Sequence, residues 1–229
     1  MESVPDMNYR TDDRPCARGE VLLRGPSIMK GYYREPGMTA EVVDGDGWFH
    51  TGDIGRFNGN GTLSIIDRKK NMFKMAQGEY ISSERLEGIF LRCSLVGQIF
   101  VYGNSYKDQI LAIVVPDPLS LIPHCTKAGV PDVVPFRTEG WKEGFATLCR
   151  RPDVREAVLA EIKEMAKENG LKGFEVPKAL YLEGHVNDLN QGFNVENDLL
   201  TPTFKLKRPA LQAKYQGAID DLYEQLEGR

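Results

Sequence analysis

The pattern of local structure signals changes abruptly after Asp67, and this change divides the chain into two parts. Before it, short strand-like runs alternate with loops rich in Gly and Pro. The segment from Asn58 to Gly61 gives a strong hairpin signal between the strands FHTGDIGRF and TLSIID. About 66 residues with few helix signals bury little apolar surface by themselves. We therefore expect residues 1–66 to be poorly packed alone and to be the last, β-rich part of a larger, incomplete domain.

After Asp67, helical and strand-like runs follow one another. A helix is expected to begin at Ser82 or Ser83, and its apolar face follows the spacing of Leu86, Ile89, Phe90 and Cys93. The strand-like run ILAIVVP is almost entirely apolar, which favours a strand buried on both faces. Helical spacing returns over residues 153–168 and at the C-terminus, with the strand-like VPKALYL between them. Residues 67–229 are therefore expected to form a compact α+β domain.

Composition excludes several classes of protein. The formal net charge of −4 disfavours a general binder of nucleic acid or of anionic membranes. The four cysteines and three histidines are scattered without a CxxC pair, so neither a zinc site nor a disulfide framework is expected, and no metal ligand is assigned. The N-terminus lacks an apolar signal segment, and no apolar run reaches the length of a membrane-spanning helix. A cytoplasmic protein with reduced cysteines is the expected class.

Asp53 is the first candidate binding residue. It follows Thr51 and Gly52 at a strand end, where glycine lets another group approach the backbone closely. A carboxylate there can accept hydrogen bonds from both hydroxyls of a ribose. The same tripeptide is also typical of an ordinary turn between strands.

A basic segment, DRKKNMFKMAQGEY, begins at the proposed boundary. Arg68, Lys69, Lys70 and Lys74 concentrate positive charge that could meet phosphates, although isolated basic runs are more often solvated surface. Gly78 is either a turn glycine or the bare backbone beside a ligand channel. A further lysine, Lys205, lies on the short segment LLTPTFKLKRP, between a Thr-Pro-Thr turn and the last helix.

The combination of motifs is more specific than any one of them. GYYREPGMT, WFHTGD, IIDRKK, FKMAQGEYIS and TPTFKLKR occur in this order over residues 18–215. The set resembles the adenylate-forming enzymes, which include acyl-CoA synthetases and the adenylation domains of peptide synthetases. The variants DGWFHTGD, IIDRKKNMFKMAQGEYIS and LLTPTFKLKRP are similar specifically to long-chain fatty acyl-CoA synthetases.

This resemblance implies a reaction in two steps. A fatty acid attacks the α-phosphate of ATP, with Mg²⁺ bound, to give an acyl-adenylate, and coenzyme A then displaces AMP to give the acyl-CoA. The fold implied is the small C-terminal domain of these enzymes, a mixed β-sheet flanked by helices, which rotates against a large N-terminal domain. Peripheral membrane association on a cytosolic face is compatible with lipid substrates.

The resemblance also implies roles for single residues. Asp53 would bind the ribose hydroxyls, Arg68 would reach the ribose or the phosphates, and Asp67 would be the hinge residue. Lys205 matches the lysine of the adenylation step, with Lys207 as the competing candidate, although Thr203 and Phe204 replace the common Ser-Gly. Lys74 and Gly78 belong to the face presented for the coenzyme A step, and one extra residue separates them relative to the shorter Lys-x-x-Gly form.

Two signatures expected upstream do not occur in the chain: the phosphate-binding loop and the segment with a Mg²⁺-binding glutamate. We therefore expect the chain to be the C-terminal part of a longer ligase, with little or no synthetase activity alone. Two alternatives stay open. One is a non-enzymatic binding or regulatory module derived from the small domain, and the other is an adenylation domain that serves a carrier protein.

Overall fold

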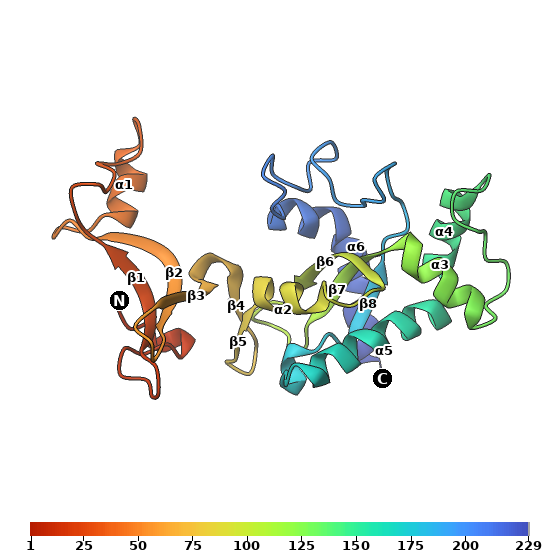
Figure 1. Ribbon diagram of the computed structural model, residues 1–229, viewed down its shortest axis with the longest axis horizontal. Coiled ribbons are helices and arrows are strands. Elements are labelled where there is room, and N and C mark those ends of the chain that lie inside the picture. Colours follow the sequence, from red (N-terminus) through yellow and green to blue (C-terminus); the bar gives the residue numbers. More distant parts are fainter. Residues whose placement is uncertain (229) are drawn as a thin grey trace. The chain divides into compact units, whose positions relative to one another are not determined.

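The computed structural model describes residues 1–228, which fall into two compact units, residues 1–73 and residues from Lys74 onward. In Figure 1 the first unit is coloured red to orange, and the second runs from yellow to blue. The division between the units lies a few residues after Asp67. In the described part of the chain, no helix combines the length and the apolar character needed to cross a membrane.

The first unit is built on a three-stranded antiparallel sheet. Its strands, in spatial order, are β1 (Arg18–Leu23), β2 (Phe49–Phe57) and β3 (Leu63–Arg68). The turn between β2 and β3 is the predicted hairpin: the Gly61 N–H donates to the Asn58 carbonyl at 2.9 Å, and Gly61 has φ of 81°. A positive φ is cheap for glycine, which explains the residue type at this turn.

The core of the first unit is small. Among the described residues of this unit, Val21 and Ile54 are the hydrophobic side chains that are buried. Several large hydrophobic side chains of the same unit are exposed: Leu23, Met29, Tyr32, Tyr33, Met38, Phe57, Leu63 and Ile65. So much exposed apolar surface is typical of a face that another part of a protein covers.

Two helical segments of the first unit were not predicted. One is the short 3-10 helix η1 (Pro5–Met7), and the other is α1 (Pro36–Val42), which begins inside the segment expected to be a loop. Pro36 is the first residue of α1, where its fixed φ suits a helix and its missing N–H costs nothing. None of the residues of α1 is buried. The helix therefore left no apolar periodicity in the sequence.

The second unit contains the predicted mixed sheet. β6 (Val96–Tyr102) pairs antiparallel with β7 (Leu111–Pro116), and β7 pairs parallel with β8 (Ala179–Leu182). Every residue of β7 is buried, as its apolar sequence predicted. Before this sheet in the chain come the 3-10 helix η2 (Lys69–Asn71), which ends within the first unit, and β4 (Met72–Lys74), which spans the division. β4 pairs with β5 (Tyr80–Ser82), and α2 (Ser83–Phe90) follows.

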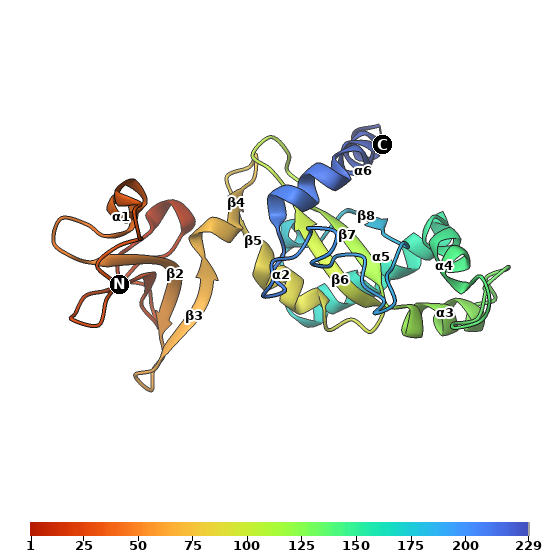
Figure 2. The ribbon, with the colours of Figure 1, turned by 90° about the horizontal axis from the view of Figure 1, so that it is seen from above.

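Helices flank this sheet. The parallel connection from β7 to β8 contains α3 (Pro118–Lys127), α4 (Trp141–Cys149), α5 (Pro152–Glu168) and the 3-10 helix η3 (Gly173–Glu175). The last helix, α6 (Arg208–Glu227), packs against β6, β7 and β8, and Figure 2 shows it in blue beside the sheet. Its buried residues share one core with β6 and β7, which includes Phe100, Ile113, Leu211, Tyr215 and Leu222.

The predicted helices agree with the structure in type and differ in detail. α5 buries Val154, Val158 and Ile162, as its spacing indicated. In α2, Ile89 is only half-buried, and the buried position next to Leu86 is taken by the charged residue Glu87. This departure from the apolar pattern turns out to have a structural reason.

Candidate functional site

Asp53 is oriented by the backbone around it. The Thr51 hydroxyl donates to the Val21 carbonyl at 2.8 Å and accepts from the Asp53 N–H at 3.1 Å. Gly52 has φ of 73°, a backbone conformation that residues other than glycine rarely adopt. Its N–H donates to the Glu20 carboxylate at 3.0 Å. The carboxylate of Asp53 is therefore carried on a strand whose local geometry is fixed, and its side chain stays 37% exposed.

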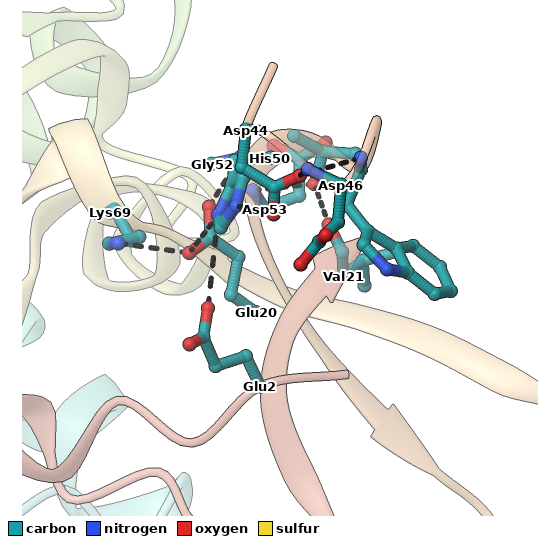
Figure 3. A network of polar contacts seen from close by, with 11 residues as sticks. Glu2, Glu20, Val21, Asp44, Asp46, His50, Gly52, Asp53 and Lys69 are labelled. Atoms are coloured by element: carbon teal, nitrogen blue, oxygen red, sulfur yellow. Dashed lines mark hydrogen bonds and ion pairs between the residues drawn. The ribbon is translucent and has the colours of Figure 1, made fainter. Parts of the chain in front are cut away.

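Glu20 is the buried centre of this region, and no motif in the sequence pointed to it. The residue is only 3% exposed, and Lys69 Nζ lies 2.9 Å from its Oε2. His50 Nδ1 lies 3.7 Å from the same oxygen, and its Nε2 lies 3.3 Å from Asp44 (Figure 3). A buried carboxylate is stable only when it is paired and hydrogen-bonded, so Lys69 serves the fold and is not free for a ligand.

Glu20, Glu2 and His50 offer three ligand atoms within 4.8 Å of one another. This set does not fit Mg²⁺, which prefers an octahedron of oxygen ligands. One of the three atoms is an imidazole nitrogen, and Glu20 Oε2 already holds the Lys69 ammonium. Within residues 1–228 these side chains form a network of ion pairs, with His50 Nδ1 3.8 Å from Glu2 and 3.7 Å from Glu20, and give no support for a magnesium centre.

Arg68 and Asp53 are brought together by the register of β2 and β3. They are direct cross-strand partners, and Arg68 Nε lies 3.4 Å from Asp53 Oδ1. Both side chains are more than one-third exposed, so the pair is accessible to a ligand. This juxtaposition of an acceptor and a cation was not visible in the sequence, because register depends on the bulge between Ile54 and Gly55.

Asp67 is the neighbour of this pair on β3. It is 9% exposed, accepts a hydrogen bond from Tyr9 Oη at 2.9 Å, and also accepts from the Arg68 N–H at 2.8 Å. The residue expected to be the hinge is therefore part of an ordered strand with both carboxylate oxygens engaged.

Lys74 and Gly78 lie on the hairpin between β4 and β5. Lys74 is exposed, and its ammonium lies 5.5 Å from the centre of the Tyr80 ring. Gly78 has φ of 88°, and its N–H donates to the Met75 carbonyl at 2.9 Å. A Cβ built on Gly78 would meet no atom within 4 Å, so the backbone here faces open space. The turn conformation requires glycine, and the same geometry leaves a bare backbone surface.

Lys205 stands on a second hairpin of the same unit. The Thr201 N–H donates to the Lys205 carbonyl at 2.8 Å, the Thr201 hydroxyl accepts from the Lys205 N–H at 3.1 Å, and Leu200 bridges to Leu206. The Lys205 side chain is exposed and makes no ion pair or hydrogen bond within residues 1–228. Phe204, just before it, has φ of 60° and is 71% exposed.

Lys207, the competing candidate, differs from Lys205 in its surroundings. Its ammonium is paired with the Asp198 carboxylate, and its side chain is 37% exposed. Its backbone N–H donates to the Leu199 carbonyl at 2.9 Å. Lys207 therefore closes the base of the hairpin, whereas Lys205 is presented at its end with a free positive charge.

The structure thus gathers the candidate residues in three places. Asp53, Asp67 and Arg68 lie together at the β2–β3 edge of the first unit. In the second unit, Lys74 and Gly78 share one hairpin, and Lys205 stands on another. The first place presents a carboxylate beside a cation. The second presents an exposed backbone turn beside a lysine, and the third presents an unpaired lysine on a hydrogen-bonded hairpin.

Comparisons with solved structures give the class of protein. The adenylation domain of a carboxylate reductase from Mycobacterium chelonae is 33% identical, with a TM-score of 0.77 over 97% of this chain and 30% of that one. The corresponding domain from Segniliparus rugosus, in complex with AMP and a co-purified carboxylic acid, is 32% identical with the same TM-score over 98% of this chain and 31% of that one. The fold is that of the adenylate-forming enzymes.

Among curated sequences, the relatives are more specific. Long chain acyl-CoA synthetase 7 of Arabidopsis thaliana is 44% identical over 99% of this chain and 30% of its own length. Long-chain-fatty-acid--CoA ligase 5 of Mus musculus is 43% identical over 99% of this chain and 30% of its own length. Over nearly its whole length the chain is similar to long-chain acyl-CoA synthetases, and it spans about 30% of the length of the curated relatives it matches. No protein-family model matches it.

Proposed function

We propose that this chain works as part of an AMP-forming long-chain fatty acid–CoA ligase. The observation that carries the proposal is its similarity to such ligases over nearly its whole length, at 43–44% identity. Because the chain spans about 30% of those relatives, the complete activity requires the rest of a polypeptide of their length. We call such a polypeptide, with this chain in its matching place, the ligase-length polypeptide.

In this proposal, Asp53 and Arg68 bind the nucleotide. Asp53 accepts hydrogen bonds from the ribose hydroxyls, and Arg68 reaches the ribose or the phosphates. Their cross-strand contact supports these roles, because a single exposed pair offers both an acceptor and a cation. Asp67, next to them, is the proposed hinge, at a position shortly before the division between the two units.

Lys205 acts in the first step and the face of Lys74 and Gly78 in the second. The free ammonium of Lys205 contacts the fatty acid carboxylate and the α-phosphate, where a cation about 4 Å from an anionic oxygen gains on the order of 4 kcal/mol at an effective dielectric near 20. In-line displacement at phosphorus depends on orientation and positive charge more than on a base. The open backbone at Gly78 then admits the pantetheine arm of coenzyme A beside Lys74.

Adenylate-forming enzymes generally use ATP with Mg²⁺, which neutralises charge on the phosphates. Residues 1–228 do not supply an oxygen site of that kind, so the proposal places the Mg²⁺ ligands elsewhere in the ligase-length polypeptide. The chain itself contributes binding of the ribose and the mobile cations.

A second candidate function is adenylation for a carrier protein. This function is favoured by a solved structure from a carboxylic acid reductase of Segniliparus rugosus, a didomain of an adenylation domain and a carrier domain in complex with AMP. That structure is 32% identical over 99% of this chain. In that case the acyl group passes to a phosphopantetheine thiol on a protein rather than to free coenzyme A.

One experiment separates these functions. The ligase-length polypeptide is incubated with palmitate and ATP, and then with either coenzyme A or a phosphopantetheinylated carrier protein. The proposal predicts AMP release and palmitoyl-CoA with free coenzyme A. Acyl transfer to the carrier alone would support the second function. If neither AMP nor pyrophosphate forms, the chain acts as a binding or regulatory module instead.

A further inference from the structure

Glu87 is a buried carboxylate on α2 that no part of the proposed chemistry uses. It is 5% exposed and lies on the face of α2 that packs into the core. Three N–H groups donate to it: the Val101 N–H and Arg208 Nη1 reach Oε1 at 2.8 and 3.1 Å, and Arg208 Nη2 reaches Oε2 at 2.7 Å. One carboxylate therefore ties together α2, β6 and the start of α6.

Arg208 is held from a second direction as well. Its guanidinium lies 5.8 Å from the centre of the Phe100 ring on β6. A planar guanidinium that makes two parallel hydrogen bonds to a carboxylate and also packs on an aromatic ring has a single well-defined orientation. Because Arg208 is the first residue of α6, this clamp fixes where the helix begins.

The Lys205 hairpin ends directly at this clamp. On one side the hairpin is anchored by Leu199 and Leu200, which are 3% and 6% exposed. On the other side its chain leads through Lys207 into Arg208. Within residues 1–228 the Lys205 side chain has no ion pair or hydrogen bond to hold it, so the direction of its ammonium depends on these two anchors.

We infer that Glu87, through Arg208, is a positioning residue that sets the direction of Lys205 for the adenylation step. The inference rests on the proposed role of Lys205. Burying an ion pair is costly, and an apolar pair of the same volume often gives equal or greater stability. A bidentate ion pair, however, fixes the orientation of the two side chains, whereas apolar contacts do not. That property is what a lysine on a loop needs if its charge has to reach one point on a phosphate.

The competing explanation is that the pair only stabilises the fold. The chain offers a matched control for it, because Glu183 is also a buried carboxylate that binds α6. It is 4% exposed and accepts from Tyr215 Oη at 2.8 Å, further along the same helix. Loss of its charge disturbs the packing of α6 without touching the clamp at Arg208.

The test uses Glu87→Gln, Arg208→Lys and Glu183→Gln in the ligase-length polypeptide. Glu87→Gln keeps the shape and an acceptor for Val101 but loses the charge, and Arg208→Lys keeps the charge but loses the fork. Adenylation is measured by palmitate-dependent exchange of pyrophosphate into ATP, and thioester formation is measured from supplied palmitoyl-adenylate and coenzyme A. Melting temperatures are recorded for every variant, and rates are compared well below the lowest of them.

We expect Glu87→Gln to lower kcat of adenylation by roughly ten- to a hundredfold, since misplacement of a reacting group by about 1 Å costs that much. The rate of thioester formation should change less than about twofold, because only the adenylation step depends on where the Lys205 ammonium points. Arg208→Lys repeats this selectivity even where Glu87→Gln is too unstable to assay. Glu183→Gln lowers the melting temperature and leaves the ratio of the two rates unchanged.

The inference is overturned if Glu87→Gln and Arg208→Lys slow both steps in proportion, as Glu183→Gln would, or slow neither. Lys205→Ala separates this failure from failure of the proposed function. Loss of adenylation in Lys205→Ala, together with normal adenylation in Glu87→Gln, would contradict the positioning role alone. Normal adenylation in Lys205→Ala would contradict the role of Lys205 on which the inference rests.

Discussion

Arg68 lies directly across the sheet from Asp53, with its Nε 3.4 Å from the Asp53 Oδ1. Neither side chain is buried, and an exposed ion pair of this geometry contributes little to stability. The pair instead offers a ligand both a carboxylate acceptor and a guanidinium cation.

Asp53→Asn in the ligase-length polypeptide is expected to raise KM for ATP by about 10- to 100-fold, the effect of losing charge-assisted hydrogen bonds. Arg68→Ala is expected to act in the same direction. Asp13→Asn is the matched control, because Asp13 is also paired with an arginine of the first unit, Arg18, at 2.8 Å. Steady-state kinetics at saturating palmitate measure the effect. An unchanged KM in Asp53→Asn would contradict the assignment.

Phe204 provides a prediction about stability. A bulky residue at φ of 60° is strained by about 1–2 kcal/mol, and Phe204 is 71% exposed, so little packing offsets this cost. Phe204→Gly is expected to raise the free energy of unfolding by about 0.5–1 kcal/mol, after the larger chain entropy of glycine is subtracted. Urea denaturation of the purified chain measures the change.

Asn190→Gly is the control for this effect, because Asn190 has φ of 60° too. Asparagine tolerates the left-handed region, so its replacement should change stability by less than about 0.5 kcal/mol. A loss of stability in Phe204→Gly would mean that the aromatic ring makes a favourable contact that outweighs the strain.

Buried thiol and phenol groups predict how stability depends on pH. Burial raises the pKa of Cys149 above its ordinary 9.0, and burial raises the pKa of Tyr215 and Tyr223 above their ordinary 10.0. The unfolded chain therefore loses these protons first, and stability that is fully present below about pH 9 declines as the pH rises further. Urea midpoints between pH 8 and 10.5 test this. A midpoint that rises over this range would contradict it.

The cysteines should differ in reactivity. Cys16 is half-buried, whereas Cys93, Cys125 and Cys149 are buried, and burial raises the pKa of each of these three thiols. Because the thiolate is the reactive form, iodoacetamide at pH 8 is expected to label Cys16 first and the other three only after denaturation. Peptide mass spectrometry gives the order. Labelling of Cys149 at the rate of Cys16 would show that its environment is open.

Several elements could be predicted because their signals are local. The hairpin between β2 and β3 is encoded by Asn58 and Gly61, and the burial of β7 follows from its apolar run. α3 was missed although Asp117 and Pro118 are a good helix start: the side chain of Asp117 accepts from the Leu119 N–H. The apolar spacing was present as well, because the buried residues Pro118, Leu121, Ile122 and Cys125 fall at i, i+3, i+4 and i+7. The signal against a helix was Pro123, which lies inside it.

The pairs that orient the site could not be predicted, because their partners are far apart in the sequence. Glu87 and Arg208 are separated by 121 positions, and Glu20 and Lys69 by 49. One clue existed for Glu87, a charged residue between Leu86 and Phe90 on the buried face of a helix. Such a residue almost always has a partner, although the sequence does not say which one.

In the proposed function Lys205 supplies the charge for adenylation, and a comparison of Lys205→Ala with Lys207→Ala tests this role. Palmitate-dependent pyrophosphate exchange and thioester formation from palmitoyl-adenylate are measured for both variants of the ligase-length polypeptide. We expect Lys205→Ala to lower the exchange by about 10²- to 10³-fold, the effect of losing one preorganised electrostatic contact, and to spare thioester formation. Lys207→Ala, which loses only its pair with Asp198, should retain most of both activities. Normal exchange in Lys205→Ala, or an equal loss of both steps, would contradict the adenylation role of Lys205.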